Sequence, residues 1–355
     1  MRKEGTGYGK QSIVRLLILL IIPFVLIGQE VQAAGPLKDD YFNKVAKNGV
    51  KKVIIPSFQI TFRTLVADTA QSKGNLFGRS PQASAAMVVS WPNVDKAMLQ
   101  KVADEVYTEF LQKFAASGLE VIPMATVTGT NAYKKLVGTS GPQVKEKYII
   151  ISPTGLITYD PGEKLDPNGS FMMGLTNTNM KGEGDILKEL NADLTGMAVA
   201  RVSLVVSIGG YKKSNSIGGS TASASISFDP VVSLYPALQN EKVGGANLTD
   251  VTILSNYVTQ EGFRHLPTSH LAKDTSHAYI QEVLSSGVVA GTLKDSMTTG
   301  ENVGMALVSV LGALSGQGAS LKKYEFTVDP ANYELGTKEI VGKFSELVVD
   351  RIKSN

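Results

Sequence analysis

The chain has 355 residues, of which 43% are hydrophobic, and a formal net charge of +3. This length and hydrophobic content suffice for one large core or two modest ones, so disorder is not the default expectation. Most of the excess positive charge lies before the first apolar run, and the nearly neutral remainder argues against a nucleic-acid binder held by a basic face. The chain has no cysteine, which excludes disulfides, thiolate metal sites and a cysteine-linked lipid anchor.

The N-terminal segment has the pattern of a secretory signal. A basic start precedes the apolar run 16–27, and Val31-Gln32-Ala33 places small or modest residues where a signal peptidase reads. The run is about a dozen residues long and contains Pro23, whereas a membrane-spanning helix needs roughly 20. We therefore predict a signal peptide at 1–33, cleaved after Ala33, with an uncleaved anchor as the alternative. The rest, 34–355, is then a single exported periplasmic domain, for which outer-membrane association stays open.

The exported part begins with a strand, an amphipathic helix and a second strand. In segment 51–62, the apolar trio 53–55 is followed by alternation, which is typical of a strand covered first on both faces and then on one. Pro56 predicts a bulge or a position beside a sheet edge. Apolar residues then recur at three- and four-residue steps over 94–117, which predicts a helix capped by Asn93. Gly118 suits a left-handed stop before a strand at 119–122.

The middle of the chain is less regular. We expect a polar loop at 71–84, a short helix at 125–137, a buried strand at 147–152, a loop-rich insertion at 153–184 and a helix at 185–194. The strongest strand signal follows at 196–208. The glycine pairs Gly209-Gly210 and Gly218-Gly219 then bracket a polar tip, which predicts a β-hairpin whose second arm is 221–228, extended by 231–238 beyond Pro230.

The final third alternates between strand-like and helix-like segments. It is predicted to contain a strand at 247–258, a helix at 276–285, a strand at 288–293, an apolar segment of ambiguous period at 303–314, a strand at 323–328 and a closing helix at 332–353. Together these elements predict an α/β (α+β) fold, a mixed β-sheet flanked by helices with a long β-hairpin insertion.

Motifs that carry chemistry are missing from this sequence. The glycines of 5–10 and 182–184 fit neither a P-loop nor a dinucleotide turn, and no Gly-x-Ser-x-Gly elbow is present. His265, His270 and His277 cluster near Asp274, but their spacing does not place two histidines one helical turn apart, so a polar loop is favoured over a metal site. We expect no catalytic residue, no cofactor and no metal.

Two short segments are candidate interaction sites instead. The first is the tip of the predicted hairpin, for which a solubilising turn is the alternative, and the second is an apolar patch of the insertion, for which core packing is the alternative. Their residues are Tyr211, Lys212 and Lys213, and Phe171, Met172 and Met173.

Several phrases resemble a family of cell-envelope proteins. These are the opening strand VKKVIIPSF, the helix DEVYTEFLQKFAASG running into LEVIP, and the strand ADLTGMAVARVSLVV. They are similar to the α/β domain of the curli-secretion lipoprotein (CsgG) and the TolB amino-terminal-like domain. The resemblance covers about 50–260 plus the last helix, and it implies a non-enzymatic assembly or interaction domain at the periplasm or outer membrane. This chain departs from that lipoprotein because it lacks the acylated cysteine.

The functional expectation is therefore a non-enzymatic periplasmic protein that acts as an assembly or interaction component of a larger envelope or secretion complex. Its expected partners are other envelope proteins or further copies of itself, without nucleic acid, and its contact surfaces are an edge strand and the hairpin 209–219. One alternative is an oligomeric outer-membrane pore that inserts 199–207, 221–228 and 287–314 as amphipathic hairpins. A second alternative is an envelope hydrolase that uses His265 or His270.

Overall fold

The computed structural model describes residues 36–40, 50–72, 83–130, 141–156, 197–218, 221–236, 249–254, 275–296 and 319–353, with single positions at 45, 133, 158, 190, 191 and 194. The chain divides into two compact units, Met1–Gly35 and Pro36–Asn355, and all described residues belong to the second. Among the helices that these residues form, none is both long enough and apolar enough to cross a membrane.

A ten-stranded mixed sheet forms the centre of the described part. Along its main path the strands are β1 (Leu37–Asp40), β13 (Thr275–Ile280), β12 (Asp250–Leu254), β8 (Ala198–Ser207), β2 (Lys52–Arg63), β7 (Tyr148–Ile151) and β6 (Gln143–Val144). The sheet is completed by β5 (Glu120–Val121), which runs parallel to β2, and by β11 (Val231–Leu234), which joins β8 to β14 (Leu284–Val289). The predicted mixed sheet is therefore confirmed.

The two central strands, β2 and β8, are parallel and almost wholly buried. Both are rich in valine and isoleucine, as expected of strands that are covered on both faces. Their register shifts between Ile54 and Ser57, which confirms the predicted irregularity at Pro56, because proline cannot donate a ladder hydrogen bond.

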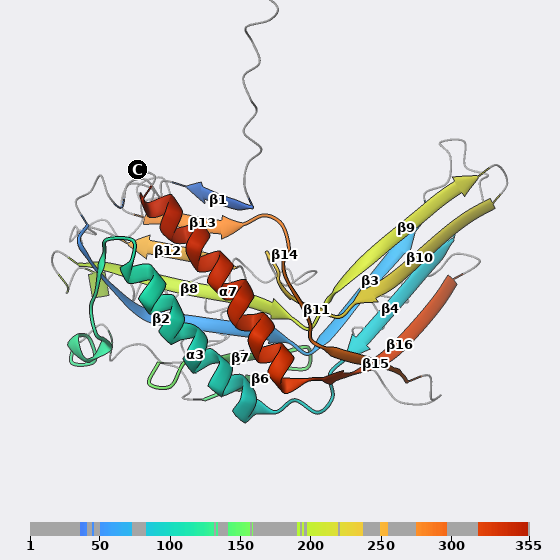
Figure 1. The fold of residues 1–355 in the computed structure, drawn as a ribbon, viewed down its shortest axis with the longest axis horizontal. Coiled ribbons are helices and arrows are strands. Elements are labelled where there is room, and N and C mark those ends of the chain that lie inside the picture. The colour runs from blue at the N-terminus through green and yellow to red at the C-terminus, as the bar shows by residue number, and fades with distance from the viewer. Residues whose placement is uncertain are drawn as a thin grey trace, which may run out of the picture. The chain divides into compact units, whose positions relative to one another are not determined.

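Two long helices, α3 (Lys96–Ala115) and α7 (Pro330–Lys353), lie side by side across one face of this sheet (Figure 1). Their buried faces meet the apolar side chains of β2 that follow the register shift, Phe58, Ile60 and Phe62. Phe58 makes edge-on ring contacts with Tyr107 and Phe110 at centroid distances of 5.1 and 5.3 Å. Tyr333 of α7 lies between Phe62 and the sole tryptophan, Trp91, and is fully buried.

The two ends of α3 can be compared with the capping residues that the sequence predicts. Asp95, and not Asn93 as predicted, caps the helix, because its Oδ1 accepts hydrogen bonds from the backbone N–H groups of Ala97 (2.9 Å) and Met98 (3.1 Å). Beyond the helix, Gly118 has a φ of 92°. The predicted left-handed stop is thus confirmed, since glycine adopts this conformation without strain.

Ion pairs join the exposed sides of the two helices. Lys101 lies 2.9 Å from Glu334, Lys338 contacts both Glu334 and Glu105, and further along Lys113 lies 2.5 Å from Glu346. Hydrogen bonds from Lys101 and Lys338 lower the pKa of the Glu334 carboxyl to about 2. The network therefore links α7 to α3 at neutral pH, in addition to the apolar contacts between them.

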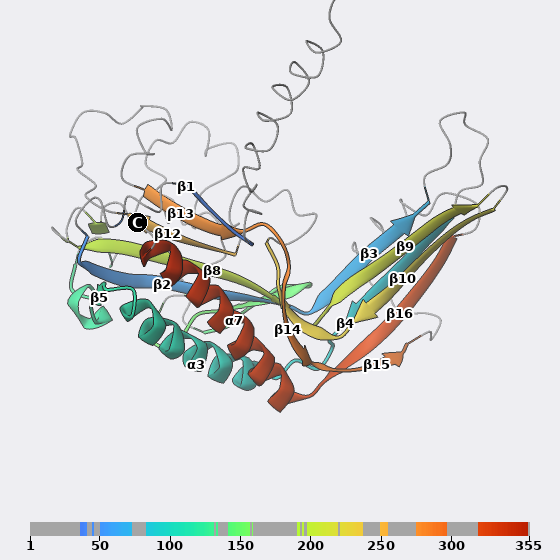
Figure 2. The same ribbon diagram turned by 45° about the horizontal axis from the view of Figure 1, so that its top comes forward.

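A second group of strands, which we call the arm, extends from the central sheet. Its sheet has the order β15 (Gly291–Asp295), β16 (Ala319–Val328), β4 (Ser84–Ser90) and β3 (Leu65–Gln71). The hairpin of β9 (Gly210–Gly218) and β10 (Thr221–Asp229) packs on β3 and β4, beside which it lies in both Figure 1 and Figure 2. Strands β4 and β16 are parallel, although they come from opposite ends of the chain.

Several predicted elements are wrong. The predicted helix 276–285 is β13 and the start of β14, because Ala278 and Ile280 alternate into the sheet beside β12. The helix predicted at 125–137 does not begin at 125, because Met124–Thr126 form a 3-10 turn and 127–129 are turns, but Tyr133 further along is helical. After Pro230 the chain does not extend the hairpin but enters β11 of the central sheet.

Other predicted segments lie outside the described residues. These are most of the helix 185–194, the segment 303–314 and nearly all of the insertion 153–184.

Candidate interaction surface

The hairpin β9–β10 has two different faces, which follow from the alternation of its sequence. On the side toward the arm sheet, Ile226 is buried, and the ring of Phe228 contacts those of Tyr211 and Phe326 at centroid distances of 5.5 and 5.8 Å. The opposite side is polar and exposed, and its described members are Lys212, Ser214, Ser223, Ser225 and Ser227. The hairpin therefore presents a row of small hydroxyl groups to its surroundings.

Tyr211 is not the exposed contact residue that the sequence suggested. Its hydroxyl group lies 2.7 Å from the Val66 carbonyl oxygen and 3.2 Å from the Met87 carbonyl oxygen, and it donates to this pair of acceptors. Burial raises the pKa of this hydroxyl well above its ordinary value. Tyr211 thus fastens the hairpin to β3 and β4, and the predicted polar tip is in fact the strand β9.

The two lysines of the candidate site behave differently. Lys212 lies on the outer face with its side chain 75% exposed, and it pairs with Asp229 across the hairpin at 2.7 Å. Lys213 leans toward the arm sheet and lies 2.7 Å from Oδ1 of Asp68 on β3. Lys212 therefore remains a candidate contact residue, whereas Lys213 ties the hairpin to the sheet.

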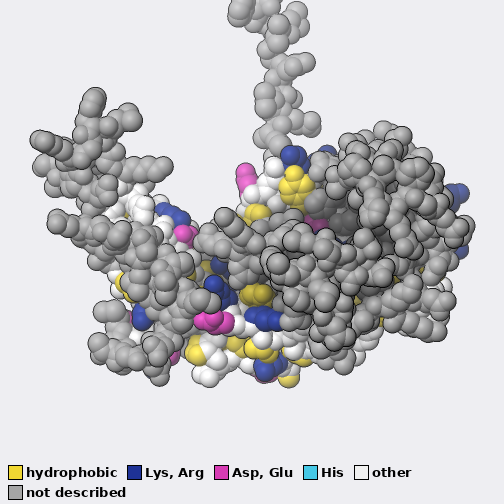
Figure 3. All heavy atoms as spheres, turned by 180° about the vertical axis from the view of Figure 1, so that it is seen from behind, with side chains coloured by type: hydrophobic (Ala, Val, Ile, Leu, Met, Phe, Trp, Pro, Cys, Tyr) yellow, Lys and Arg dark blue, Asp and Glu magenta, His cyan; other side chains and the backbone are white. Residues whose placement is uncertain are grey.

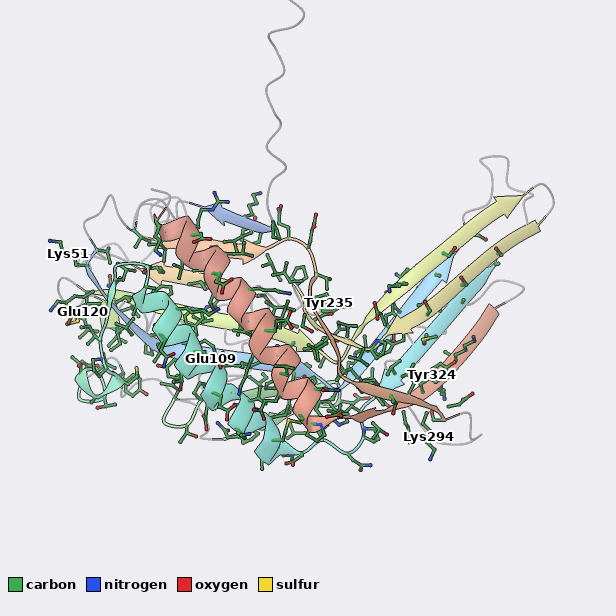
Figure 4. The ribbon with its side chains drawn as sticks, in the orientation of Figure 1. Lys51, Glu109, Glu120, Tyr235, Lys294 and Tyr324 are labelled. Carbon is green, nitrogen blue, oxygen red and sulfur yellow. The ribbon has the colours of Figure 1, made fainter. Side chains whose placement is uncertain are left out.

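At the base of the hairpin, the backbone at Gly209 approaches the backbone at Asp229 so closely that a side chain does not fit between them. A Cβ atom on Gly209 would lie 2.4 Å from the Asp229 carbonyl oxygen, so no other residue fits without a shift of the backbone. The carbonyl group of Gly209 accepts hydrogen bonds from the hydroxyl groups of Ser207 (2.8 Å) and Tyr235 (3.4 Å). Figure 4 shows Tyr235 where the central sheet meets the arm.

A buried arginine that no sequence motif indicates lies beside this base. Arg63 ends β2, and its guanidinium carbon is 4.8 Å from the centroid of the Tyr235 ring. Its Nη1 has no hydrogen-bond acceptor among the described residues. Burial lowers the pKa of Arg63, an effect that the nearby Tyr235, Tyr211 and Asp68 partly offset. The polar alternation before it along β2 (Ser57, Gln59, Thr61) was the signal that could have indicated a polar sheet face.

That polar face lies on the side of the sheet opposite the helices. The buried Asp250 of β12 lies 2.7 Å from the guanidinium group of Arg201 on β8. This ion pair joins β12 to β8 on that face. Figure 3 shows the molecule from this side, with basic and acidic side chains among the coloured atoms.

The described part of the chain gives little support to the remaining candidates, which are a metal site, catalytic histidines and a ligand pocket. Within it, no three His, Asp or Glu side chains form a group that could hold a metal ion. His265 and His270, as well as Phe171, Met172 and Met173, lie outside the described residues, and His277 lies in β13. A shallow depression between α3 and α7, beside Phe110 and Val341, has no interior space for even a water-sized molecule, so it is not a ligand pocket.

Comparison with known proteins assigns no family to this chain. No family model, no curated protein and no solved structure matches the chain. The resemblance to the CsgG and TolB domains therefore stays a prediction that depends on the sequence phrases quoted above.

Proposed function

We propose that this protein is a non-enzymatic cell-envelope component that binds other envelope proteins through its arm, as part of a larger envelope or secretion complex. The observation that carries the proposal is the hairpin β9–β10, whose polar outer face is exposed and whose outer strand edges pair with no other described strand. Open strand edges are places where a further chain can add by backbone hydrogen bonds. The signal-like N-terminus supports an exported, periplasmic location.

The chemistry of the described side chains also favours binding over catalysis. Among the described acidic groups, Asp250 and Glu334 are held in ion pairs, and Asp68 is bound to Lys213. Structural ion pairs of this kind hold strands and helices in register. Binding through a surface therefore agrees better with these residues than proton transfer does.

The experiment that tests the proposal is site-specific photo-crosslinking in the native envelope. A photoreactive amino acid replaces Ser225, which is exposed on the outer face of the hairpin, and in a matched control it replaces Thr108, which is exposed on α3. We expect the probe at Ser225 to capture a defined envelope protein that the probe at Thr108 does not. Equal capture at both positions, or capture at neither, would contradict a role for the arm.

A second candidate function is a membrane-inserted pore subunit, and the dimensions of the hairpin favour it. Strands β9 and β10 have nine residues each, and strands of about 9–11 residues can cross a bilayer. The pairing that the sequence suggested for such a pore is wrong, because β8 lies between β2 and β12 in the central sheet. Purified full-length protein that raises the conductance of a planar lipid bilayer would favour this function over the first.

A further inference from the structure

The hairpin β9–β10 is attached to the rest of the arm by side chains and not by a strand ladder. Its two strands pair with each other and with no other described strand. The described attachments are the Tyr211 hydroxyl group, the Lys213–Asp68 ion pair and the ring contact between Phe228 and Phe326. Moving the hairpin away from the arm sheet would therefore break no ladder hydrogen bond of the described strands.

A hairpin that leaves this position must find an equivalent surface. Its departure would expose Ile226, and on the sheet it would uncover Val66, Met87 and Phe326, which are at most 4% exposed. Burial of such apolar side chains is a main source of stability, so neither surface would remain in water. A second copy of this chain carries the matching surface, with the same apolar contacts and an Asp68 for each Lys213.

The base of the hairpin has the features of a hinge. The chain enters through Gly209-Gly210 and leaves through Pro230, and glycine allows large changes of backbone angle. Arg63 lies beside it as a buried cation whose Nη1 lacks an acceptor among the described residues. Opening of the base would allow water to reach this guanidinium group.

We propose that the hairpin β9–β10 is exchangeable and that, in an assembled form, it packs on the β3–β4–β16 sheet of a second copy of this chain. Exchange of an identical element needs no new interface, because the same contacts form between copies as within one. The inference rests on the proposed function in one respect, the arm as a contact surface, and it names a second copy as the partner.

Zero-length carbodiimide crosslinking can test this directly, because it joins an amine to a carboxylate only where they touch. The Lys213–Asp68 pair, at 2.7 Å, reports the position of the hairpin. The Lys113–Glu346 pair, at 2.5 Å, joins α3 to α7 and serves as the control within one chain. Equal amounts of ¹⁵N-labelled and unlabelled full-length protein are unfolded together, refolded and then crosslinked. After digestion, mass spectrometry identifies the crosslinked peptides and shows whether the two peptides of each link carry the same label.

With exchange, we expect about half of the Lys213–Asp68 links in the oligomer fraction to join a labelled peptide to an unlabelled one, while the Lys113–Glu346 links stay unmixed. The proposal is overturned if the Lys213–Asp68 links are all unmixed, or if they are missing while the control link forms.

A complementation experiment gives a second measurement. Asp68→Asn and Lys213→Gln each remove one partner of the pair, so neither variant alone forms this link. A mixture of the two variants restores it as a covalent dimer only if the hairpin of one copy reaches the sheet of the other.

The two proposals fail in different ways. Unmixed links together with capture of another envelope protein by the probe at Ser225 would refute exchange and leave the proposed function standing. Mixed links without such capture would refute binding to other envelope proteins and leave self-assembly standing.

Discussion

Replacing Tyr333 by phenylalanine is expected to raise the free energy of unfolding, because the hydroxyl group of Tyr333 is fully buried and has no hydrogen-bond partner among the described residues. An unsatisfied buried polar group costs about 1–3 kcal/mol. Phenylalanine removes this cost and keeps the ring contacts with Trp91 and Phe62, at 5.2 and 6.3 Å. We therefore expect Tyr333→Phe to stabilise the protein by about 1–2 kcal/mol.

The matched control is the same substitution at Tyr211, whose hydroxyl group donates to the Val66 and Met87 carbonyl groups. Tyr211→Phe loses this hydrogen bond and should lower the free energy of unfolding by about 0.5–1.5 kcal/mol. Urea unfolding is followed by circular dichroism and by the fluorescence of Trp91, the only tryptophan of the chain. The reasoning is refuted if Tyr333→Phe destabilises the protein as much as Tyr211→Phe does.

Three further predictions concern the hairpin base, the helix pair and the core. Gly209→Ala should lower the melting temperature, because its Cβ would lie 2.4 Å from a carbonyl oxygen. The control Gly342→Ala in α7, where only the flexible Lys113 is near, should not lower it. Equal changes of the melting temperature would contradict this prediction. The pKa of Glu334 is lowered from 4.5 to about 2, so its stabilising effect is present above about pH 4.5 and is lost as the pH falls toward 2. Unfolding curves of Glu334→Gln and the unmutated protein should therefore differ at pH 7 and converge near pH 2, and a constant difference would contradict the assignment. Phe110→Ala should cost about 3–5 kcal/mol in urea unfolding, and a loss below about 1 kcal/mol would show that Phe110 is not a core residue.

The parts of the fold that sequence predicted correctly have long, regular apolar patterns. Segments 51–62 and 196–208 are β2 and β8, and 94–117 and 332–353 are α3 and α7, each within a few residues. These elements bury a continuous face, so the period of the apolar residues determines both their type and their orientation.

Within the arm, the sequence predicts strands at 221–228 and 323–328, which are β10 and part of β16, but it does not predict β3 and β4. Strand β4 (SAAMVVS) combines small residues with no alternation, and β3 (LVADTAQ) has few strong strand formers. Strand β3 pairs with β4, and β4 in turn pairs with β16, which is distant in sequence. At the candidate site, the exposure of Lys212 follows from local sequence, whereas the burial of Tyr211 and Arg63 depends on how the hairpin packs on the arm sheet.

The parallel pairing of β4 with β16 sets a limit on when the arm can form. The hydroxyl group of Ser90 donates to the carbonyl group of Tyr324, which lies 234 residues further along the chain. Closing so long a loop is slow, and during synthesis it must wait until nearly all of the chain has been made. Strands β2 and β8 and helix α3 can meet earlier, so the surface proposed for binding is among the last parts of the molecule to be completed. A partner that needs the finished arm sheet would therefore bind only chains whose C-terminal strand and helix are already in place.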